Sequence, residues 1–306
     1  MKMEVYNDIK EMIGNTPILK LTHLDIDPNV NLYAKLELMN PAGSVKDRIG
    51  LYMIEDAKKK GLLKPGGTIV DATAGNTGIG ITIAALNQGF NVIFAVPEKF
   101  SIEKQKVMQA LGAKLIHTPR EGGMLGAKNE ALKIIEKTPG AISLDQFTNP
   151  ANPRAHYETT GPEIYRQMDG KIDFFVAGAG SGGTFSGTVR YLKEQDEGIR
   201  GVLADPYGSI IGGGEHADYD IEGIGNDFIA DTMDVSLIDQ VIKITDEEAF
   251  NASRMLALKE GILAGSSSGA ALAASIKLAA QIGHGNIVTV FPDRGDRYLS
   301  KGLYDE

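Results

Sequence analysis

The chain has 306 residues, of which 42% are hydrophobic and 23% charged, so it can form a globular protein with a substantial core. Its net charge of −9 argues against nucleic acid or an anionic membrane as a partner. The absence of cysteine excludes disulfides, thiolate metal sites and a cysteine nucleophile.

Short runs of β-forming residues alternate with longer helical segments, which predicts α/β layers around mostly parallel strands. In chain order the predicted strands are Asn31–Leu36, Thr68–Ala72, Asn91–Val96, Lys114–His117, Ile172–Ala177, Gly201–Asp205, Val241–Ile244 and Asn286–Phe291. The predicted helices are Val45–Lys60, Thr77–Gln88, Ile102–Leu111, Leu125–Lys137, Arg154–Met168, Thr184–Glu194, Asp246–Lys259 and Gly269–Ile282. The stretch from Tyr207 to Met233 lacks regular periodicity, so we expect a long functional loop there.

Three glycine-rich turns stand before predicted helices, where free backbone N–H groups favour anions. They are Asp71–Gly78, Gly178–Thr184 and Ala264–Gly269. Taken alone, each could be a structural turn or a helix cap. The second satisfies G-x-G-x-x-G, and Asp205 ends the next predicted strand, so a nicotinamide-dependent dehydrogenase is an alternative reading of this part of the sequence.

A segment that contains a lysine favours a functional role for these turns. The run Asn40-Pro41-Ala42-Gly43-Ser44-Val45-Lys46-Asp47-Arg48 resembles the cofactor-lysine segment of the cysteine synthase and cystathionine β-synthase family. Members of this family are fold-type II pyridoxal-phosphate enzymes, similar to the tryptophan synthase β chain. Further family motifs follow the same order: Ile13–Pro17, Thr73–Gly78, Pro97–Lys99, Asp145–Phe147, Gly180–Thr184, Glu222–Gly225 and Ser267.

The resemblance implies a pyridoxal 5′-phosphate site and a role for each matching residue. Lys46 would form the Schiff base with the cofactor, Asn76 would bond its 3′-oxygen, and Ser267 would face its pyridine nitrogen. The phosphate would be held by the loop Gly180, Ser181, Gly182, Gly183 and Thr184. The substrate carboxylate would lie against Thr73, Ala74, Asn76, Thr77 and Gln146, and the loop with Gly225 would face the nucleophile.

The same resemblance implies the reaction, which is β-replacement on a small amino acid. Lys46 would act as the general base for the Cα proton, the β-substituent would leave to give an α-aminoacrylate, and a nucleophile would add at Cβ. A serine at position 267 cannot stabilise a protonated pyridinium as an aspartate would, which favours elimination over transamination. O-Acetylserine, serine or cysteine would be the first substrate, and cysteine or cystathionine the product.

Two positions depart from the family pattern. Ala74 stands where many cysteine synthases have serine. Asp231 stands in Phe228-Ile229-Ala230-Asp231, where many relatives have proline after Phe-Ile. Asp231 could be a solvated acid or a cap. Alternatively, it could be a catalytic carboxylate that binds a polar second substrate or activates water. Water as the nucleophile would convert cysteine into serine and release hydrogen sulfide, and a second thiol in place of water would also release hydrogen sulfide.

The runs Asp145–Pro150, Asp205–Ser209 and Glu222–Ile229 look more like bacterial cystathionine β-synthases than like plain cysteine synthases. We expect two three-layer α/β domains with mostly parallel sheets. A small mobile domain, Asn40–Gln146, would carry Lys46 and the carboxylate loop, and a large domain, Met1–Met39 with Phe147–Glu306, would bind the cofactor phosphate. A non-catalytic amino-acid sensor with the same fold is a further alternative.

The expected location is the cytoplasm, and the expected partners are small amino acids and a second copy of the chain. Met1–Lys10 shows no signal-peptide pattern, and the longest apolar runs, such as Asn91–Val96, are too short to cross a bilayer. The homodimer is implied by the resemblance alone. The five histidines form no metal-binding pattern, which favours packing or surface roles: His23, His117, His156, His216 and His284.

Overall fold

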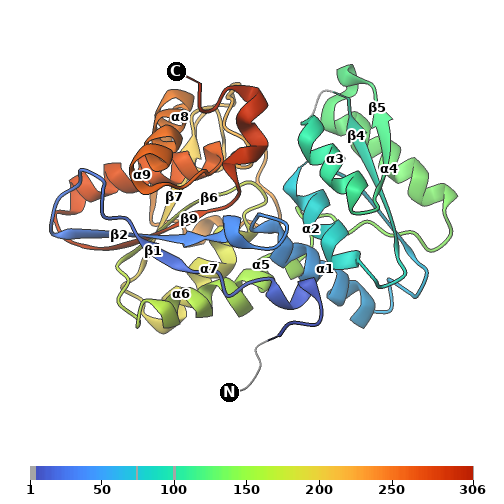
Figure 1. Cartoon of the computed structure of the whole chain (residues 1–306), viewed down its shortest axis with the longest axis horizontal. Coiled ribbons are helices and arrows are strands. Elements are labelled where there is room, and N and C mark those ends of the chain that lie inside the picture. Colours follow the sequence, from blue (N-terminus) through green and yellow to red (C-terminus); the bar gives the residue numbers. More distant parts are fainter. Residues whose placement is uncertain (1–4, 74, 99–100, 306) are drawn as a thin grey trace. The chain divides into compact units, whose positions relative to one another are not determined.

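Figure 1 shows the computed structural model of the chain, which describes residues 5–73, 75–98 and 101–305. The chain divides into two compact units. The small unit contains Lys46–Ala151 and the described residues up to Ile13, and the large unit contains Gly14–Val45 and the chain from Asn152 onward. The small unit therefore begins and ends later than the sequence-based small domain and also includes an N-terminal segment. Lys10 ties that segment to the unit, because its Nζ donates to the carbonyl of Leu86 over 2.9 Å.

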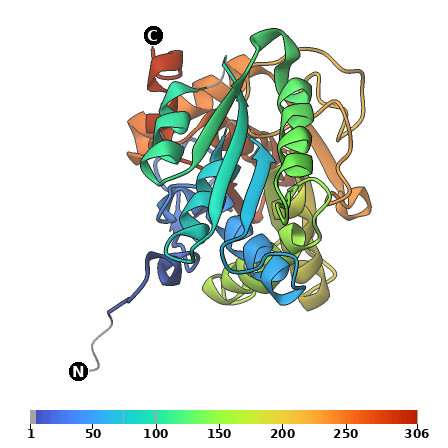
Figure 2. The same ribbon diagram turned by 90° about the vertical axis from the view of Figure 1, so that its right-hand side faces the viewer.

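The small unit contains a parallel sheet whose strand order is β3-β4-β5. Its strands lie side by side in Figure 2 and are β3 (Thr68–Ala72), β4 (Asn91–Pro97) and β5 (Lys114–Thr118). Its helices are α1 (Lys46–Lys59), α2 (Asn76–Ala85), α3 (Ile102–Ala110) and α4 (Gly123–Lys137). Helix α4 presents Ala127 and Ala131 to Val70 and Ala95 of the sheet, so small side chains allow a close approach of helix and strands.

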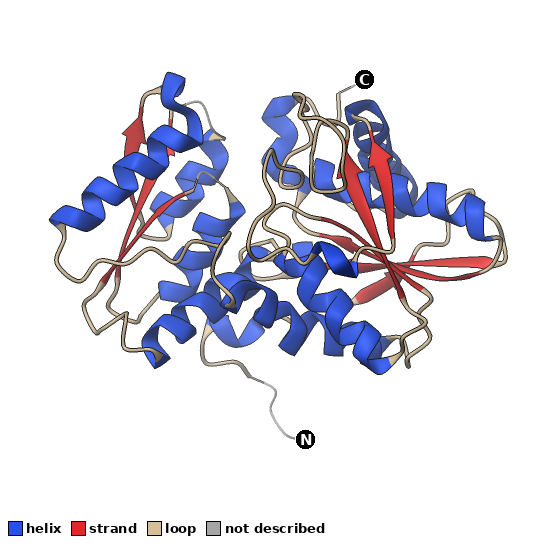
Figure 3. Cartoon of the chain, turned by 180° about the vertical axis from the view of Figure 1, so that it is seen from behind, coloured by secondary structure: helices blue, strands red, loops and turns tan. Residues whose placement is uncertain are grey.

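The large unit contains a sheet of order β1-β2-β9-β6-β7-β8, in which only the β1–β2 pair is antiparallel. Its strands are β1 (Ile18–Lys20), β2 (Val30–Leu36), β6 (Phe174–Gly178), β7 (Arg200–Pro206), β8 (Gln240–Ile244) and β9 (Gly285–Phe291). Its helices, drawn blue beside the red strands in Figure 3, include α6 (Gly161–Gln167), α7 (Gly183–Gln195), α8 (Asp246–Met255) and α9 (Ser266–Ile282). Helix α5 (Ala151–Ala155) and the π-helical turn His156–Thr160 lead into α6.

Alternate residues of the central strands face two different cores, as the two-residue period of a strand requires. In β6, Val176 belongs to the core that contains α8 and α9, whereas Phe175 and Ala177 belong to the core that contains α6 and α7. Because both faces of the sheet are covered by helices, the strands read as nearly continuous apolar runs in the sequence.

Every predicted strand is present, and no strand end differs from its predicted position by more than two residues. Every predicted helix is also present. The helix predicted at Arg154–Met168 begins earlier, at Ala151, and contains a π-helical turn, and the helix predicted at Asp246–Lys259 continues from Met255 into the π-helical turn Leu256–Glu260. The helix predicted at Gly269–Ile282 begins at Ser266. The long segment between β7 and the 3₁₀ turn Val235–Leu237 contains no helix or strand, which confirms the predicted loop. Among the helices in the described part of the chain, none combines the length and apolar character that a membrane crossing requires.

Candidate cofactor and substrate site

The predicted cofactor contacts of the large unit follow the carboxyl ends of its parallel strands, where α/β sheets bind ligands. The phosphate loop follows β6, the long loop with Gly225 and Asp231 follows β7, and the segment that leads to Lys46 follows β2. That last segment is fixed to the end of β9, because Val45 N–H donates to the carbonyl of Pro292 over 2.8 Å. One edge of the sheet therefore collects these loops.

The phosphate loop has the conformation of an anion cradle. Gly182 adopts a left-handed φ of 82° as the N-cap of α7, so the helix begins at Gly183 with its positive end toward the loop. Among the described residues, none accepts a hydrogen bond from the N–H groups of Gly180, Ser181 or Gly182. Free donors at the positive end of a helix suit a dianionic phosphate, so these residues fit the cofactor that the sequence implies.

Two residues that support this loop were not assigned to the site from the sequence. Asn152 Nδ2 donates to Ser181 Oγ over 2.9 Å, and His156 Nε2 lies 3.2 Å from Thr184 Oγ1. Both supporting side chains are buried. His156 was predicted to have a packing or surface role, and the structure places it in direct contact with the phosphate loop. His156 follows Asn152 by four residues, a spacing that places two side chains on the same face of a helix. This spacing was the signal from which a shared role could have been predicted.

Ser267 lies in the first turn of α9 and is buried with its two serine neighbours. Ser266 Oγ accepts a hydrogen bond from the N–H of Glu222 over 3.0 Å. A β-carbon built on Gly223 would lie 3.9 Å from Ser267 Oγ, and one built on Gly180 would lie 2.7 Å from the Gly223 carbonyl oxygen. The structure thus brings Ser267, the Gly223 loop and the phosphate loop together in the large unit.

Gly225 lies against the phenol of Tyr219, a third residue that the sequence did not indicate. Its φ is 79°, and a β-carbon there would meet Tyr219 Oη at 2.5 Å, so glycine is required for both reasons. Burial raises the pKa of Tyr219 to about 12, with a further contribution from the negative charges of Asp205, Asp227 and Asp246. The phenol therefore stays protonated at neutral pH.

Asp231 lies on the same long loop with its side chain exposed. Its neighbours Ala230 and Thr232 are buried, so the backbone at this position is anchored although the carboxylate is not. Within the described ranges the Asp231 side chain makes no hydrogen bond and no ion pair. The carboxylate is accessible to solvent.

Asp205, the residue on which the nicotinamide alternative depended, is engaged elsewhere. It is fully buried, and its Oδ2 accepts hydrogen bonds from Lys243 Nζ over 2.6 Å and from Gly212 N–H over 2.9 Å. A ribose-binding acid needs an accessible carboxylate. The G-x-G-x-x-G spacing here therefore lacks the accessible acid that the nicotinamide alternative requires.

Lys46 is the first residue of α1 in the small unit, and α2 approaches it closely. A β-carbon built on Gly80 would lie 2.3 Å from the carbonyl oxygen of Lys46, and one built on Gly50 would lie 2.3 Å from the carbonyl oxygen of Gly80. The helices thus cross at two glycines. This crossing fixes the backbone from which the Lys46 side chain extends.

The predicted carboxylate site is also part of the small unit. Thr77 Oγ1 donates to Gln146 Oε1 over 2.8 Å, so two residues far apart in the sequence meet as expected. Thr73 is buried, its Oγ1 accepts from Gly75 N–H over 3.4 Å, and Asn76 is the first residue of α2. Ala74, the first departure from the family pattern, lies outside the described residues.

Asp71, near the end of β3, holds the segment that places Gln146 next to Thr77. The segment before Gln146 pairs in parallel with β3, where Ile142 lies opposite Ile69. Asp71 then accepts hydrogen bonds from the Ser143 hydroxyl, from Leu144 N–H over 3.1 Å and from Asp145 N–H over 3.3 Å. Burial favours the neutral acid and raises the pKa of Asp71 to about 6, although these hydrogen bonds oppose the shift.

This raised pKa makes the stability of the protein depend on pH. Between about pH 4 and pH 6 the folded protein keeps the Asp71 proton that the unfolded chain releases. The folded state then binds more protons, so the contribution of Asp71 to stability falls as pH rises through this window. Above about pH 6 the carboxyl is ionised in both states and the contribution is constant.

An Asp71→Asn variant is expected to lose this pH dependence. Relative to the variant, the wild type should lose about 2 kcal/mol in free energy of unfolding between pH 4 and pH 7. Urea unfolding at several pH values measures this difference. Glu136→Gln, at an exposed position of α4, is the control and should show no comparable change. A constant difference between wild type and Asp71→Asn would contradict the raised pKa.

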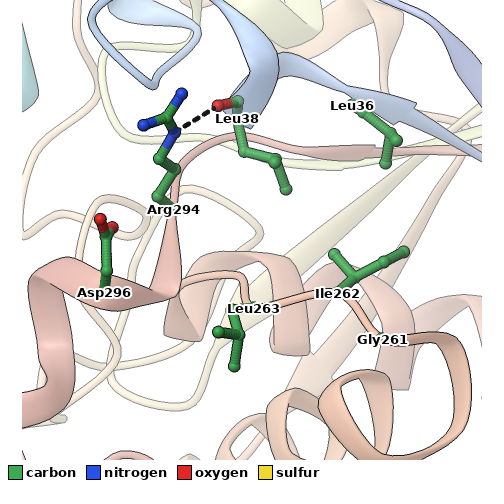
Figure 4. Close-up of a pocket in the computed structure, with 7 residues that line it drawn as sticks. All are labelled: Leu36, Leu38, Gly261, Ile262, Leu263, Arg294 and Asp296. Carbon is green, nitrogen blue, oxygen red and sulfur yellow. Dashed lines mark hydrogen bonds between the residues drawn. The ribbon is translucent and has the colours of Figure 1, made fainter.

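Figure 4 shows a pocket of about 330 Å³ in the large unit that contains none of the predicted site residues. Arg294 and Asp296 lie at one side, and Arg294 Nε donates to the carbonyl of Leu38 over 3.1 Å. The rest of the lining is formed by Leu36, Leu38, Gly261, Ile262 and Leu263. Mainly apolar and without the glycine-rich turns, this pocket is separate from the candidate site.

Comparisons with known proteins identify the relatives of this chain. Residues 9–293 match the family described as "Pyridoxal-phosphate dependent enzyme". The chain is 52% identical over 304 residues to an O-acetylserine-dependent cystathionine β-synthase of Bacillus subtilis (strain 168), with 99% of each covered. The crystal structure of the O-acetylserine-dependent cystathionine β-synthase of Helicobacter pylori has a TM-score of 0.93 at 46% identity, over 99% of this chain and 100% of that one. The crystal structure of a hydrogen sulfide-producing enzyme of Fusobacterium nucleatum has a TM-score of 0.92 at 36% identity, over 96% of this chain and 100% of that one.

Proposed function

Because the chain belongs to the family of pyridoxal-phosphate-dependent enzymes, we propose that it catalyses β-replacement on a small amino acid. O-Acetylserine, serine or cysteine is the first substrate, and cysteine or cystathionine is the product. The observation that carries this choice of reaction is the buried hydroxyl of Ser267 near Gly223, at the position where the family binds the pyridine nitrogen. A neutral partner at that nitrogen favours the loss of a β-substituent over transamination.

Bound pyridoxal phosphate supplies an aldehyde for covalent attachment and a ring that withdraws electrons from Cα of the substrate. The protein supplies the remaining functions. Lys46 attaches the cofactor and moves the proton at Cα. The N–H groups of Gly180–Gly183 and the Thr184 hydroxyl bind the phosphate, and Asn76 bonds the 3′-oxygen. Thr73, Thr77 and Gln146 orient the substrate carboxylate, supported by the hydrogen bond between Thr77 and Gln146.

O-Acetylserine with homocysteine is our first choice of substrates, because the B. subtilis relative carries the name of that activity. The experiment that tests it supplies purified enzyme with O-acetylserine, serine and cysteine in turn. Homocysteine, sulfide and cysteine are present together as acceptors, and mass spectrometry identifies the products. Cystathionine as the main product supports the proposal. Bound cofactor without turnover of any pair would instead favour an amino-acid sensor.

A second candidate activity is the replacement of the cysteine thiol by water, which releases hydrogen sulfide and forms serine. Two observations favour it. The Asp231 carboxylate is exposed on the loop that carries Gly225, and the chain is 36% identical to a hydrogen sulfide-producing enzyme. In this reaction the C–S bond at Cβ breaks first, and the sulfur takes a proton from solvent and leaves as hydrogen sulfide. The Asp231 carboxylate then accepts a proton from water as the water oxygen bonds to Cβ, and it returns that proton to solvent.

An Asp231→Asn variant is expected to form less serine from cysteine, by about 10²-fold, because the general base for water is lost. Formation of cystathionine from O-acetylserine and homocysteine should change little. The measurement is the ratio of serine to cystathionine in parallel assays. Asp218→Asn, an exposed acid on the same long loop, is the control and should leave the ratio unchanged. An equal ratio in wild type and Asp231→Asn would remove Asp231 from the reaction.

A homodimer, which rests on the family resemblance, and a location in the cytoplasm complete the proposal. Light scattering on the purified protein, which gives the mass of the assembly, tests the first of them. A mass equal to that of one chain would contradict the dimer.

A further inference from the structure

Three consecutive carbonyl groups of the phosphate loop are bound from the same stretch of chain. Ala179 O accepts from Gly225 N–H over 2.7 Å. Gly180 O accepts from Asn226 Nδ2 over 2.7 Å, and Ser181 O accepts from Thr232 Oγ1 over 2.5 Å. All donors belong to the segment Gly225–Thr232, which begins in the Gly223–Gly225 loop that the family resemblance associates with the nucleophile and not with the phosphate.

The planarity of the peptide bond gives these contacts a consequence. In a trans peptide unit the C=O of one residue and the N–H of the next point in opposite directions. Holding the carbonyls of Ala179, Gly180 and Ser181 on one side therefore turns the N–H groups of Gly180, Ser181 and Gly182 to the other side. These are the donors for which the described residues provide no acceptor.

The donor segment is itself held in place, so it can act as a fixed support. Asn226 N–H donates to Ser209 Oγ over 3.3 Å, and Asn226 O accepts from Ile210 N–H over 3.0 Å. Thr232 is buried. The next residue, Met233, packs closely against Gly182, because a β-carbon built on Gly182 would lie 2.4 Å from Met233 Cβ. The two side-chain contacts with the phosphate loop are therefore made from an anchored segment and not from a free loop.

We propose that Asn226 and Thr232 are positioning residues that preorganise the phosphate cradle by fixing its carbonyl groups from behind. The inference rests on the proposed function, because it assumes that the loop Gly180–Thr184 binds the cofactor phosphate. Preorganised donors bind an anion without reorienting first, so loss of either side chain weakens phosphate binding selectively. The loop proposed to receive the nucleophile thus also sets the affinity for the cofactor.

A Thr232→Val variant tests the hydroxyl with little change of volume. The apoenzyme, stripped of cofactor, is titrated with pyridoxal 5′-phosphate and, separately, with pyridoxal, which lacks the phosphate. We expect Kd for pyridoxal 5′-phosphate to rise about fivefold, the size of one hydrogen bond, and Kd for pyridoxal to stay the same. Thr232→Ser, which keeps the hydroxyl, should restore the affinity for pyridoxal 5′-phosphate.

Thr289→Val is the matched control. Thr289 is also buried in the large unit, and its Oγ1 also donates to a backbone carbonyl, that of Val176 in β6 over 3.1 Å. The same chemical change is thus made away from the cradle, and Kd for pyridoxal 5′-phosphate should stay at the wild-type value even if thermal stability falls.

Asn226→Ala provides an independent test of the second carbonyl. Its control is Asn31→Ala, because Asn31 Nδ2 donates a single hydrogen bond to Asn286 Oδ1 over 3.1 Å in the same unit. We expect the loss of affinity for pyridoxal 5′-phosphate in Asn226→Ala alone, together with a changed ³¹P chemical shift of the bound phosphate.

Two outcomes would overturn the inference. In one, Thr232→Val and Asn226→Ala bind pyridoxal 5′-phosphate as tightly as the wild type. In the other, they lose affinity for pyridoxal to the same extent, which would indicate a general loss of structure. Failure of the proposed function looks different, because the wild-type apoenzyme itself would then show no preference for the phosphorylated compound.

Discussion

A Lys46→Ala variant is expected to lose at least about 10⁴-fold in turnover, the upper end of what a general base contributes, because it also loses the covalent attachment of the cofactor. Borohydride reduction followed by intact-mass measurement should give a cofactor adduct on the wild-type protein and none on the variant. Peptide mapping should place the wild-type adduct at residue 46.

Lys59→Ala is the control for this experiment, because Lys59 is exposed near the end of the same helix. It should keep both the adduct and the activity. Near-normal turnover of Lys46→Ala, or an adduct that persists in it, would remove the cofactor lysine from position 46 and with it the proposed reaction.

A Gly80→Ala variant is expected to lose about 3 kcal/mol in free energy of unfolding and most of its activity. The added β-carbon would lie 2.3 Å from the carbonyl oxygen of Lys46, a backbone atom that cannot turn aside as a side chain can. Helices α1 and α2 must then separate, which displaces the backbone that carries the Lys46 side chain. Urea unfolding and turnover measure the two effects.

Gly126→Ala provides the matched control, because Gly126 also lies inside a helix of the small unit, but a β-carbon there would meet no atom within 4 Å. The substitution should stabilise the protein by about 1 kcal/mol through helix propensity alone. Equal stability changes in the two variants would show that the crossing of α1 and α2 does not depend on its glycines.

The architecture could be predicted from the sequence because its strands are buried on both faces and therefore read as apolar runs. Strand β1 was not predicted. It has only three residues, and two of them, Leu19 and Lys20, are exposed. It pairs antiparallel at the edge of the sheet, where one face has no core to impose a pattern. The helix that begins at Ala151 was assigned too late because its first turn has no apolar periodicity.

The site could be predicted only in part, for a related reason. Motifs contiguous in the sequence, such as the phosphate loop, could be recognised locally. The side chains that hold those motifs could not. Asp71 acts on Ser143–Asp145, and Asn226 and Thr232 act on Gly180 and Ser181, so each contact joins segments far apart in the chain. An asparagine or threonine on an irregular loop carries no local signal of the carbonyl it will bind.

The pairing of the Ile142–Gln146 segment beside β3 has a consequence for how such an enzyme can diversify. It places Gln146 and Thr77 in one unit, whereas the phosphate loop belongs wholly to the other. On the proposed roles, the side chains that recognise the amino acid are thus encoded in the small unit together with Lys46 and Asn76, whereas the loop that binds the cofactor phosphate is encoded in the large unit. Selection could therefore change the preferred amino acid through substitutions in the small unit while the phosphate-binding loop of the large unit stays the same.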